Sequence, residues 1–234
     1  MADLSGFPIT NRWPAQRPDA IQLYSLPTPN GVKASIMLEE CALDYEVHRI
    51  SIGDPEDQMT PEYLSLNPNN KIPALIDPNG PGGEPMGLWE SGAILVYLAD
   101  KTGLFLPREG AARYYTLQWL MFQMGGVGPM FGQIGFFHRY KGREIEDKRP
   151  LNRYVNEAKR LLGVIDRQLD GRDWITGDYS IADIAIAPWV RNLRTGYEAA
   201  ELVGLDDFAD IGPWVDRFAA RPAVERGLNI PPRQ

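Results

Sequence analysis

Cysteine is nearly absent from this 234-residue chain, which has a single one, Cys41, and two histidines. A lone cysteine excludes an intramolecular disulfide framework, a CxxC pair and a zinc cluster built on cysteines. We therefore expect no bound metal, and a reducing cytoplasm is the compartment that this composition favours. Cys41 falls inside a predicted helix, where a free cysteine usually acts as a small packing residue.

An excess of positive charge and long apolar runs are also lacking. The chain has 24 Lys and Arg against 31 Asp and Glu, for a net charge of −7. We do not expect nucleic acid as the main partner, because phosphate binding needs a basic face, although a helix N-terminus can still bind a small anion. No apolar run reaches the ~18 residues of a membrane span, and residues 1–19 lack a signal-peptide pattern. The sequence thus predicts a cytoplasmic protein with no membrane contact.

The remaining composition is that of a globular protein, with 44% hydrophobic residues, enough for a sizeable core. Residues 1–19 contain three prolines and no apolar periodicity. They are predicted to form an extended arm, ordered only if Phe7 and Trp13 pack onto the body of the protein.

The next segment alternates strand and helix patterns. The order is β-α-β-(α)-β-β-α, with a polar loop over residues 53–70 that holds one short helix. Strands are predicted over residues 21–26, 45–52, 72–76 and 86–89, and helices over residues 32–43 and 91–102. This order is that of a thioredoxin-like fold, an α/β domain whose small mixed sheet has helices on both faces. We assign it residues 20–104.

Strand patterns disappear after this domain, and residues 111–234 are predicted to form an all-α, helical-bundle domain. Helices are expected over residues 111–137, 151–169, 180–190, 197–203 and 212–220, the first as one bent helix or two. Ser180 followed by Asp183 is close to a capping box at the start of its helix.

Thr28-Pro29-Asn30-Gly31 is the first of three segments that carry chemistry, because it joins the first strand to the first helix. In an open α/β sheet, ligands bind beyond the carboxyl ends of the strands. A hydroxyl, an amide and helix N-terminal N–H groups at this point are suitable donors to a thiolate. Alternatively, Asn30 merely caps the helix and Thr28 fills the turn.

The second segment, Asn70-Lys71-Ile72-Pro73-Ala74, opens a strand next to that turn. The backbone N–H and C=O of Ile72 can pair with a peptide ligand as a short added strand. Whether Pro73 follows a cis bond is not decided by the residues themselves. The alternative is an ordinary edge-strand proline.

The third segment is Trp89-Glu90-Ser91-Gly92 at the start of the following helix. Ser91 and the free N–H groups of the helix suit a carboxylate, and Glu90 suits an ammonium. Together they fit an amino-acid zwitterion, although a simple helix cap is the alternative.

These three segments, in this order and spacing, resemble the cytosolic glutathione transferases over residues 20–225. There, a cis proline after the third strand's loop and a Glu-Ser pair hold glutathione. Within the family, the three motifs and Gly125-Gly126-Val127-Gly128-Pro129-Met130 are similar to the bacterial Nu class of disulfide-bond reductases and to the transferase-like domain of the yeast prion-forming nitrogen regulator.

The resemblance implies that Thr28 and Asn30 approach the glutathione sulfur as catalytic residues. It also implies a set of glutathione-binding residues: Gln58, Lys71, Ile72, Pro73, Glu90, Ser91 and Arg153. Arg153 resembles a residue that reaches the site of a partner subunit, which implies a homodimer. The match at Gln58 is looser than the others.

The activity implied is glutathione-dependent disulfide reduction with modest conjugating activity, using reduced glutathione or glutathione disulfide and a small-molecule or disulfide acceptor. The helical domain would bind the second substrate, through some of its aromatic residues, and make the dimer contacts. No protein cysteine is needed. Of the adjacent strand residues Tyr24 and Ser25, Ser25 is the reserve candidate for contact with the glutathione sulfur. The alternatives are a glutathione lyase that cleaves aryl ethers and a non-catalytic regulatory module.

Overall fold

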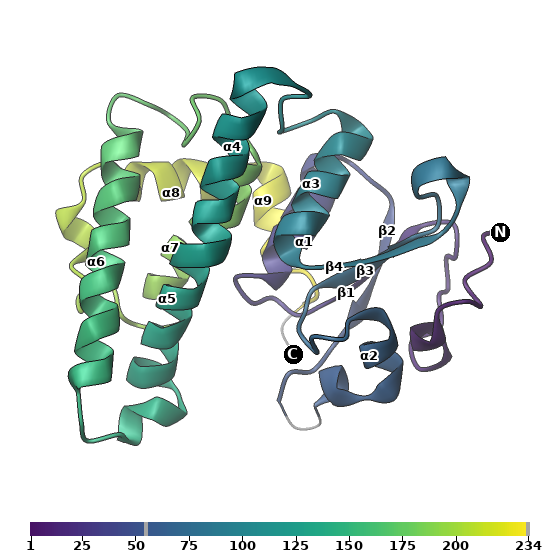
Figure 1. The fold of residues 1–234 in the computed structure, drawn as a ribbon, viewed down its shortest axis with the longest axis horizontal. Helices are drawn as coiled ribbons and strands as arrows, with labels where there is room; N and C mark the ends of the chain where they lie inside the picture. Colours follow the sequence, from purple (N-terminus) through teal and green to yellow (C-terminus); the bar gives the residue numbers. More distant parts are fainter. Residues whose placement is uncertain (54–55, 233–234) are drawn as a thin grey trace. The chain divides into compact units, whose positions relative to one another are not determined.

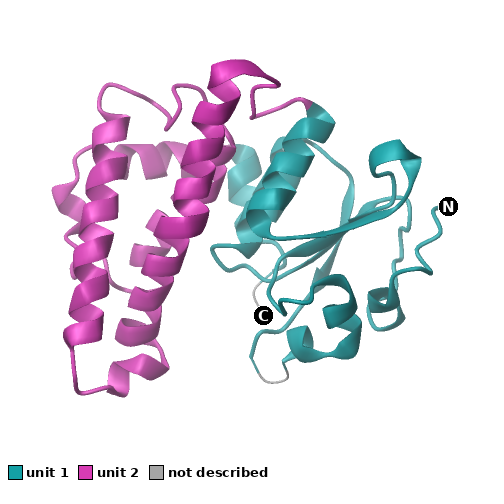
Figure 2. Ribbon diagram, viewed as in Figure 1, with its two compact units in different colours: residues 1–102, 222–234 teal, residues 103–221 magenta. Residues whose placement is uncertain are grey.

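The computed structural model describes residues 1–53 and 56–232. Residues 54–55, in the loop predicted over 53–70, and 233–234, at the end of the domain predicted over 111–234, lie outside the described residues. The chain divides into two compact units: residues 1–102 with 222–234, and residues 103–221 (Figure 2).

The first unit is built on a mixed sheet. Its strands are β1 (Ile21–Ser25), β2 (Tyr45–Arg49), β3 (Ala74–Asp77) and β4 (Met86–Trp89). Within the described residues they form one four-stranded sheet in the order β2-β1-β3-β4, with β1 parallel to β2 and antiparallel to β3, and β3 antiparallel to β4. This arrangement confirms the thioredoxin-like fold. β3 begins two residues later than predicted, because Pro73 has no N–H to contribute to the ladder.

Helices cover both faces of this sheet. α1 (Gly31–Glu40) and α3 (Ser91–Thr102) lie on one face, and α2 (Pro61–Leu66) lies on the other (Figure 1). Because α1 is enclosed, its residues from Gly31 to Leu38 are all buried. Over these residues the helix lacks a solvated face, so its polar Lys33 and Ser35 side chains need hydrogen-bond partners inside the protein.

The end of the chain returns to this first unit, as α9 (Pro222–Gly227), whereas the sequence analysis assigned it to the helical domain. Gly227 packs against the backbone of α1: a Cβ atom at this glycine would lie 2.6 Å from the Ile36 Cα. The Ser35 hydroxyl also donates to the Gly227 carbonyl over 2.6 Å. These contacts depend on tertiary packing, which local periodicity does not reveal.

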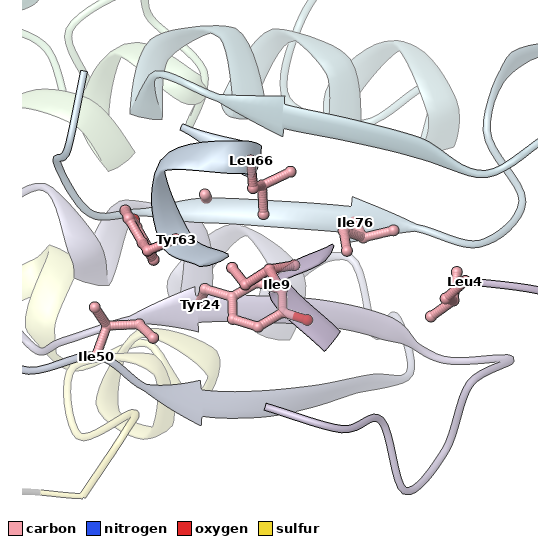
Figure 3. Packing of buried hydrophobic residues seen from close by; sticks show 8 residues of the cluster. Leu4, Ile9, Tyr24, Ile50, Tyr63, Leu66 and Ile76 are labelled. Carbon is pink, nitrogen blue, oxygen red and sulfur yellow. The ribbon is translucent and has the colours of Figure 1, made fainter. Parts of the chain in front are cut away.

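The N-terminal segment is ordered but not simply extended, in contrast to the prediction. It contains a 3₁₀ turn, Pro8–Asn11, and its Leu4 and Ile9 are buried beside Tyr24 and Ile76 of the sheet (Figure 3). Phe7 and Trp13 pack on the same cluster, as the predicted condition for order requires. Apolar burial against the sheet supplies the free energy that orders the arm.

The second unit is helical. Its helices are α4 (Gly110–Phe122), α5 (Gly128–Ile134), α6 (Arg149–Leu169), α7 (Ile181–Thr195) and α8 (Ile211–Ala219). A π-helical turn, Gln123–Val127, joins α4 to α5. The segment predicted over 111–137 as one bent helix or two is therefore two α-helices connected by a π-helical turn. In α6 the buried residues recur every three or four positions, which gives the helix one buried face: Val155, Ala158, Leu161, Leu162, Ile165 and Leu169. Among the described residues, no helix is long and apolar enough to cross a membrane.

The helix predicted over 197–203 is wrong. Beyond α7 the chain turns at Glu198, whose φ of 53° is left-handed, and a helix cannot pass through that conformation. Tyr197 is buried and its backbone N–H donates to the Asn192 carbonyl over 2.9 Å, which closes the end of α7. The buried residues of this segment, Tyr197, Ala199 and Val203, lie in turns and other non-helical backbone.

α7 begins with a complete capping box made by Ser180 and Asp183. The buried Asp183 carboxylate accepts from the Ile175 N–H and the Trp214 indole N–H, each at 3.0 Å, and from the backbone and hydroxyl of Ser180. Burial raises the pKa of Asp183 to about 6, although the four donors act in the opposite direction. One carboxylate thus connects α7, α8 and the loop before α7.

We expect Asp183→Asn to destabilise the second unit by about 2–4 kcal/mol, because an amide nitrogen would face two buried N–H donors that then lack an acceptor. Denaturant unfolding measures this loss. Asp178→Asn, an exposed change in the same loop, is the control and should stay within ~0.5 kcal/mol of the unaltered protein. Equal stabilities for the two variants would contradict this role of Asp183.

Candidate functional site

The strand register brings the three predicted segments to one end of the sheet. Ala74, at the start of β3, pairs with Tyr24 near the end of β1 on one side and with Trp89 at the end of β4 on the other. The segments that follow β1, precede β3 and follow β4 are therefore neighbours. This end holds Thr28, Asn30, Ile72, Pro73, Glu90 and Ser91.

The turn between β1 and α1 is tight. Gly31 is required there, because a Cβ atom would lie 1.9 Å from the Leu26 carbonyl oxygen. The Thr28 hydroxyl oxygen accepts from the Gly31 N–H over 3.2 Å, so Thr28 satisfies a helix N-terminal donor. Its own O–H hydrogen remains a donor. The turn thus places a half-buried hydroxyl at the end of the sheet.

Asn30 makes no side-chain cap of α1, in contrast to the alternative interpretation. Its amide oxygen instead accepts from the Lys33 ammonium over 2.9 Å. The same ammonium lies 3.3 Å from the Ser91 hydroxyl oxygen at the start of α3. One cation thus contacts two of the predicted site residues.

Sequence reasoning overlooked Lys33, whose side chain is fully buried. Burial lowers the pKa of Lys33 to about 7, and the charge of Glu90 partly opposes that shift. One signal was present in the sequence: a lysine in the first turn of a helix opposes the helix dipole, so it needs compensating partners. The identity of those partners required the folded structure.

The Ile72–Pro73 peptide bond is cis, as the family resemblance implies. The carbonyl of the preceding Lys71 accepts from the Tyr63 hydroxyl over 2.7 Å and from the Asn67 side-chain amide. These two bonds fix the backbone that enters β3. The Lys71 side chain itself is exposed.

Glu90 has a left-handed backbone, with φ of 73°, and an exposed side chain. For a residue other than glycine this conformation costs about 1–3 kcal/mol and persists where the surroundings impose it, often at binding sites. It turns the chain so that Ser91 begins α3 with its hydroxyl buried. The N-terminus of α3 thus carries the Glu90 carboxylate next to the Ser91 hydroxyl.

Gln58 lies in the short 3₁₀ turn Asp57–Met59, downstream of β2. Its side chain is 7% exposed, and its Oε1 has no hydrogen-bond partner among the described residues. A buried amide oxygen without a donor is costly, so it favours a ligand at this position.

Arg153 belongs to the second unit, on the exposed side of α6. It lines a surface hollow of about 790 Å³ with Met130, Tyr154, Asn156, Glu157 and Arg160. Of the aromatic residues of this unit, Trp119 and Tyr197 are buried, whereas Tyr114 and Tyr140 are exposed. Within the parts of the chain that the structure describes, no group of three or more His, Cys, Asp or Glu residues is placed to hold a metal ion.

Tyr24 and Ser25 point to opposite faces of β1, and both are fully buried. The Tyr24 ring stacks on His48 and belongs to the buried cluster on which the N-terminal arm packs. Burial raises the pKa of the Tyr24 hydroxyl far above its ordinary value. The Ser25 hydroxyl lies 3.4 Å from the Leu26 carbonyl oxygen. Tyr24 is therefore an unsuitable partner for a bound sulfur.

Cys41 is the residue that follows α1, as its C-cap, and not inside the helix as predicted; it is half-buried, with its sulfur 3.5 Å from the Thr102 hydroxyl. Burial raises the pKa of this thiol above its ordinary value, so at neutral pH it is protonated and a weak nucleophile.

We expect iodoacetamide to alkylate Cys41 in the folded protein more slowly than free glutathione at pH 8, because less thiolate is present. The rate should keep rising with pH beyond the ordinary thiol range, about pH 8.5. Mass spectrometry of samples quenched at successive times measures the modification. Alkylation as fast as that of free glutathione at pH 8 would contradict the raised pKa.

Two family models match the chain: the N-terminal domain of glutathione S-transferase over residues 19–100 and the C-terminal domain of the same family over residues 129–222. The disulfide-bond oxidoreductase YfcG of Escherichia coli (strain K12) is 44% identical over 210 residues, which cover 89% of this chain and 94% of that protein.

Solved structures match over nearly the whole chain. A glutathione transferase from Pseudomonas putida, with one glutathione disulfide bound per subunit, is 63% identical with a TM-score of 0.96, covering 98% of this chain and 99% of that chain. A family member from Pseudomonas fluorescens pf-5, with two glutathione bound, is 66% identical with a TM-score of 0.95, covering 96% and 99%.

Proposed function

The chain belongs to the glutathione S-transferase family, and we propose that it is a glutathione-dependent disulfide-bond oxidoreductase. The thioredoxin-like unit binds glutathione, and the helical unit supplies the acceptor site and the contacts of a homodimer. The enzyme works in the cytoplasm, where the glutathione pool is kept reduced.

The bound ligands of the two Pseudomonas relatives are the strongest support. One holds two glutathione molecules and the other holds one glutathione disulfide, the reduced and oxidised forms of the same pair. A site that accepts both forms suits a reaction in which two glutathione thiols become one disulfide. The relative YfcG is named a disulfide-bond oxidoreductase.

The proposed reaction has two thiol–disulfide exchanges. A glutathione thiolate attacks one sulfur of the acceptor disulfide, forms a mixed disulfide and expels the other sulfur as a thiolate. A second glutathione thiolate attacks the glutathione sulfur of the mixed disulfide and releases glutathione disulfide and the second acceptor thiol. The acceptor gains two electrons, which the two glutathiones lose, and the thiols' protons pass to the released thiolates through water. No protein cysteine takes part.

The rest of the tripeptide is held by the other residues at this end of the sheet. Ser91 and the N–H groups of α3 bind the γ-glutamyl carboxylate, and Glu90 binds its ammonium. Ile72 pairs through its backbone with the cysteinyl residue, and the cis Pro73 shapes that edge. Gln58 and Lys71 bind the glutathione backbone and its carboxylate.

Thr28 and Asn30 stabilise the thiolate. Lowering a thiol pKa from ~8.5–9 to ~6.5 requires roughly 3 kcal/mol at ~1.36 kcal/mol per unit. Two hydrogen bonds to an anion, at ~1.5–3 kcal/mol each, with a helix-dipole contribution of ~0.3–1 kcal/mol, are sufficient. The Thr28 hydroxyl and the Asn30 amide are the two donors.

We expect Thr28→Ala and Asn30→Ala each to lower turnover by ~10-fold or more, because each removes one hydrogen bond to the thiolate. The assay is reduction of 2-hydroxyethyl disulfide by glutathione, coupled to glutathione reductase, with circular dichroism to confirm the fold. Cys41→Ala is the matched control and should keep its activity. Unaltered rates in both Thr28 and Asn30 variants, or loss of activity in Cys41→Ala, would contradict this assignment.

Arg153 reaches the site of the partner subunit in the proposed homodimer. We expect Arg153→Ala to lower turnover several-fold with little change in the unfolding midpoint, because the side chain is exposed in the single chain. Lys159→Ala, also exposed on α6, is the control. Sedimentation velocity of the unaltered protein measures the assembly. A monomer at assay concentration, or full activity of Arg153→Ala, would contradict this role.

A further inference from the structure

We propose that Lys33 is a positioning residue that joins the two anion-binding ends of the glutathione site, so that Asn30 at the sulfur and Ser91 at the γ-glutamyl carboxylate act as one unit. This inference rests on the proposed function. It concerns a residue that the three sequence segments do not contain.

Lys33 is placed to do this by its burial and by its contacts with Asn30 and Ser91. Its ammonium lies 2.9 Å from the Asn30 amide oxygen and 3.3 Å from the Ser91 hydroxyl oxygen, although Ser91 is 58 residues further along the chain. The Lys33 side chain is 0% exposed, so water does not screen these contacts. α1 and α3 are thus connected at their N-termini by one cation.

The contact with Asn30 fixes the orientation of an amide. A lysine ammonium only donates hydrogen bonds, so the amide atom that faces it must be the oxygen. The two N–H donors of Asn30 then lie on the other side of the amide. Only this orientation lets Asn30 donate to a thiolate, because the reverse flip would present an oxygen to a negative sulfur.

The contact with Ser91 similarly fixes the orientation of a hydroxyl, at the end of the site that binds the γ-glutamyl carboxylate. Because Lys33 donates to the Ser91 oxygen, the Ser91 O–H is directed away from the ammonium and can donate to a carboxylate. The two anions of the ligand thus bind groups that one buried cation polarises. Hydrogen bonds of this kind strengthen one another in a low-dielectric site.

The charge balance around Lys33 also favours an anionic ligand. A buried ammonium in the first turn of a helix is unfavourable both by desolvation and by its interaction with the helix dipole. Glu90 opposes part of this cost, and burial still lowers the pKa of Lys33 to about 7. A bound thiolate and carboxylate would add negative charge, raise that pKa and keep the ammonium protonated.

The test is a titration of the thiol of bound glutathione, followed by the ultraviolet absorbance of its thiolate. We expect the pKa of the bound thiol to lie well below that of free glutathione in the unaltered protein. In Lys33→Met, an unbranched side chain one atom shorter that has no donors or charge, the pKa of the bound thiol should rise by about one unit or more. The glutathione dissociation constant should rise as well.

Lys101→Met is the control, because Lys101 belongs to the same unit but pairs with the Asp77 carboxylate, at 2.9 Å, and not with Asn30 or Ser91. It should leave the thiol pKa unaltered. Lys33→Gln, which keeps a neutral donor, is the second variant if Lys33→Met folds poorly, and it should give an intermediate shift. In an Asn30→Ala background, Lys33→Met should have a much smaller effect on the thiol pKa, because its action passes through Asn30.

The outcomes are distinguishable. If glutathione does not bind to the unaltered protein, or binds with an ordinary thiol pKa, the proposed function fails and this inference fails with it. If the unaltered protein lowers the thiol pKa and a folded Lys33 variant lowers it equally, the proposed function stands and the role of Lys33 is wrong. A merely structural lysine would change the unfolding midpoint without changing the thiol pKa.

Discussion

The pairing of β3 between β1 and β4 is the constraint on which the candidate site depends. Ala74 pairs with Tyr24 and with Trp89, so three segments that are far apart in the sequence meet at one end of the sheet. Because strand register is set in steps of one residue, a slip would turn every side chain of β3 to the opposite face. All four residues of β3 are buried, so each of them is packed in this register. The same pairing places Pro73, which cannot join the ladder, next to the turn that holds Thr28.

The site is also organised by charges that local sequence motifs do not explain. Lys33 carries a buried positive charge where the helix dipole disfavours one, and Glu90 adopts a left-handed backbone next to it. Both features cost free energy in the protein alone. A ligand with negative groups at two positions would explain why both features are present. The end of the sheet where ligand binding is proposed is thus destabilising in the protein alone. The apolar cluster around Tyr24 and the packing of α9 on α1 stabilise the same unit.

The first unit differs from a dithiol enzyme because it has a single cysteine, Cys41, and not a pair. Its thiol is half-buried near Thr102, with a raised pKa. The fold therefore retains the architecture of a thiol–disulfide protein, while the proposed reactive sulfur belongs to the ligand. The protein's contribution is then to bind, orient and ionise that sulfur, which hydroxyl and amide donors at the start of α1 can do.

The sequence by itself determined the order of strands and helices, the division into an α/β part and a helical part, the capping box at Ser180 and the three motifs. These features follow from periodicity, turn residues and short spacings, which are local. Only the tertiary structure decided the return of α9 to the first unit, the packing of the arm, the turn in place of a helix after α7, and the partners of Lys33. Each of these depends on contacts between residues distant in the chain: Lys33 meets Ser91 across 58 residues, and Gly227 meets α1 from the opposite end of the sequence. Periodicity reports which face of an element is apolar, but it carries no information about which surface will cover that face.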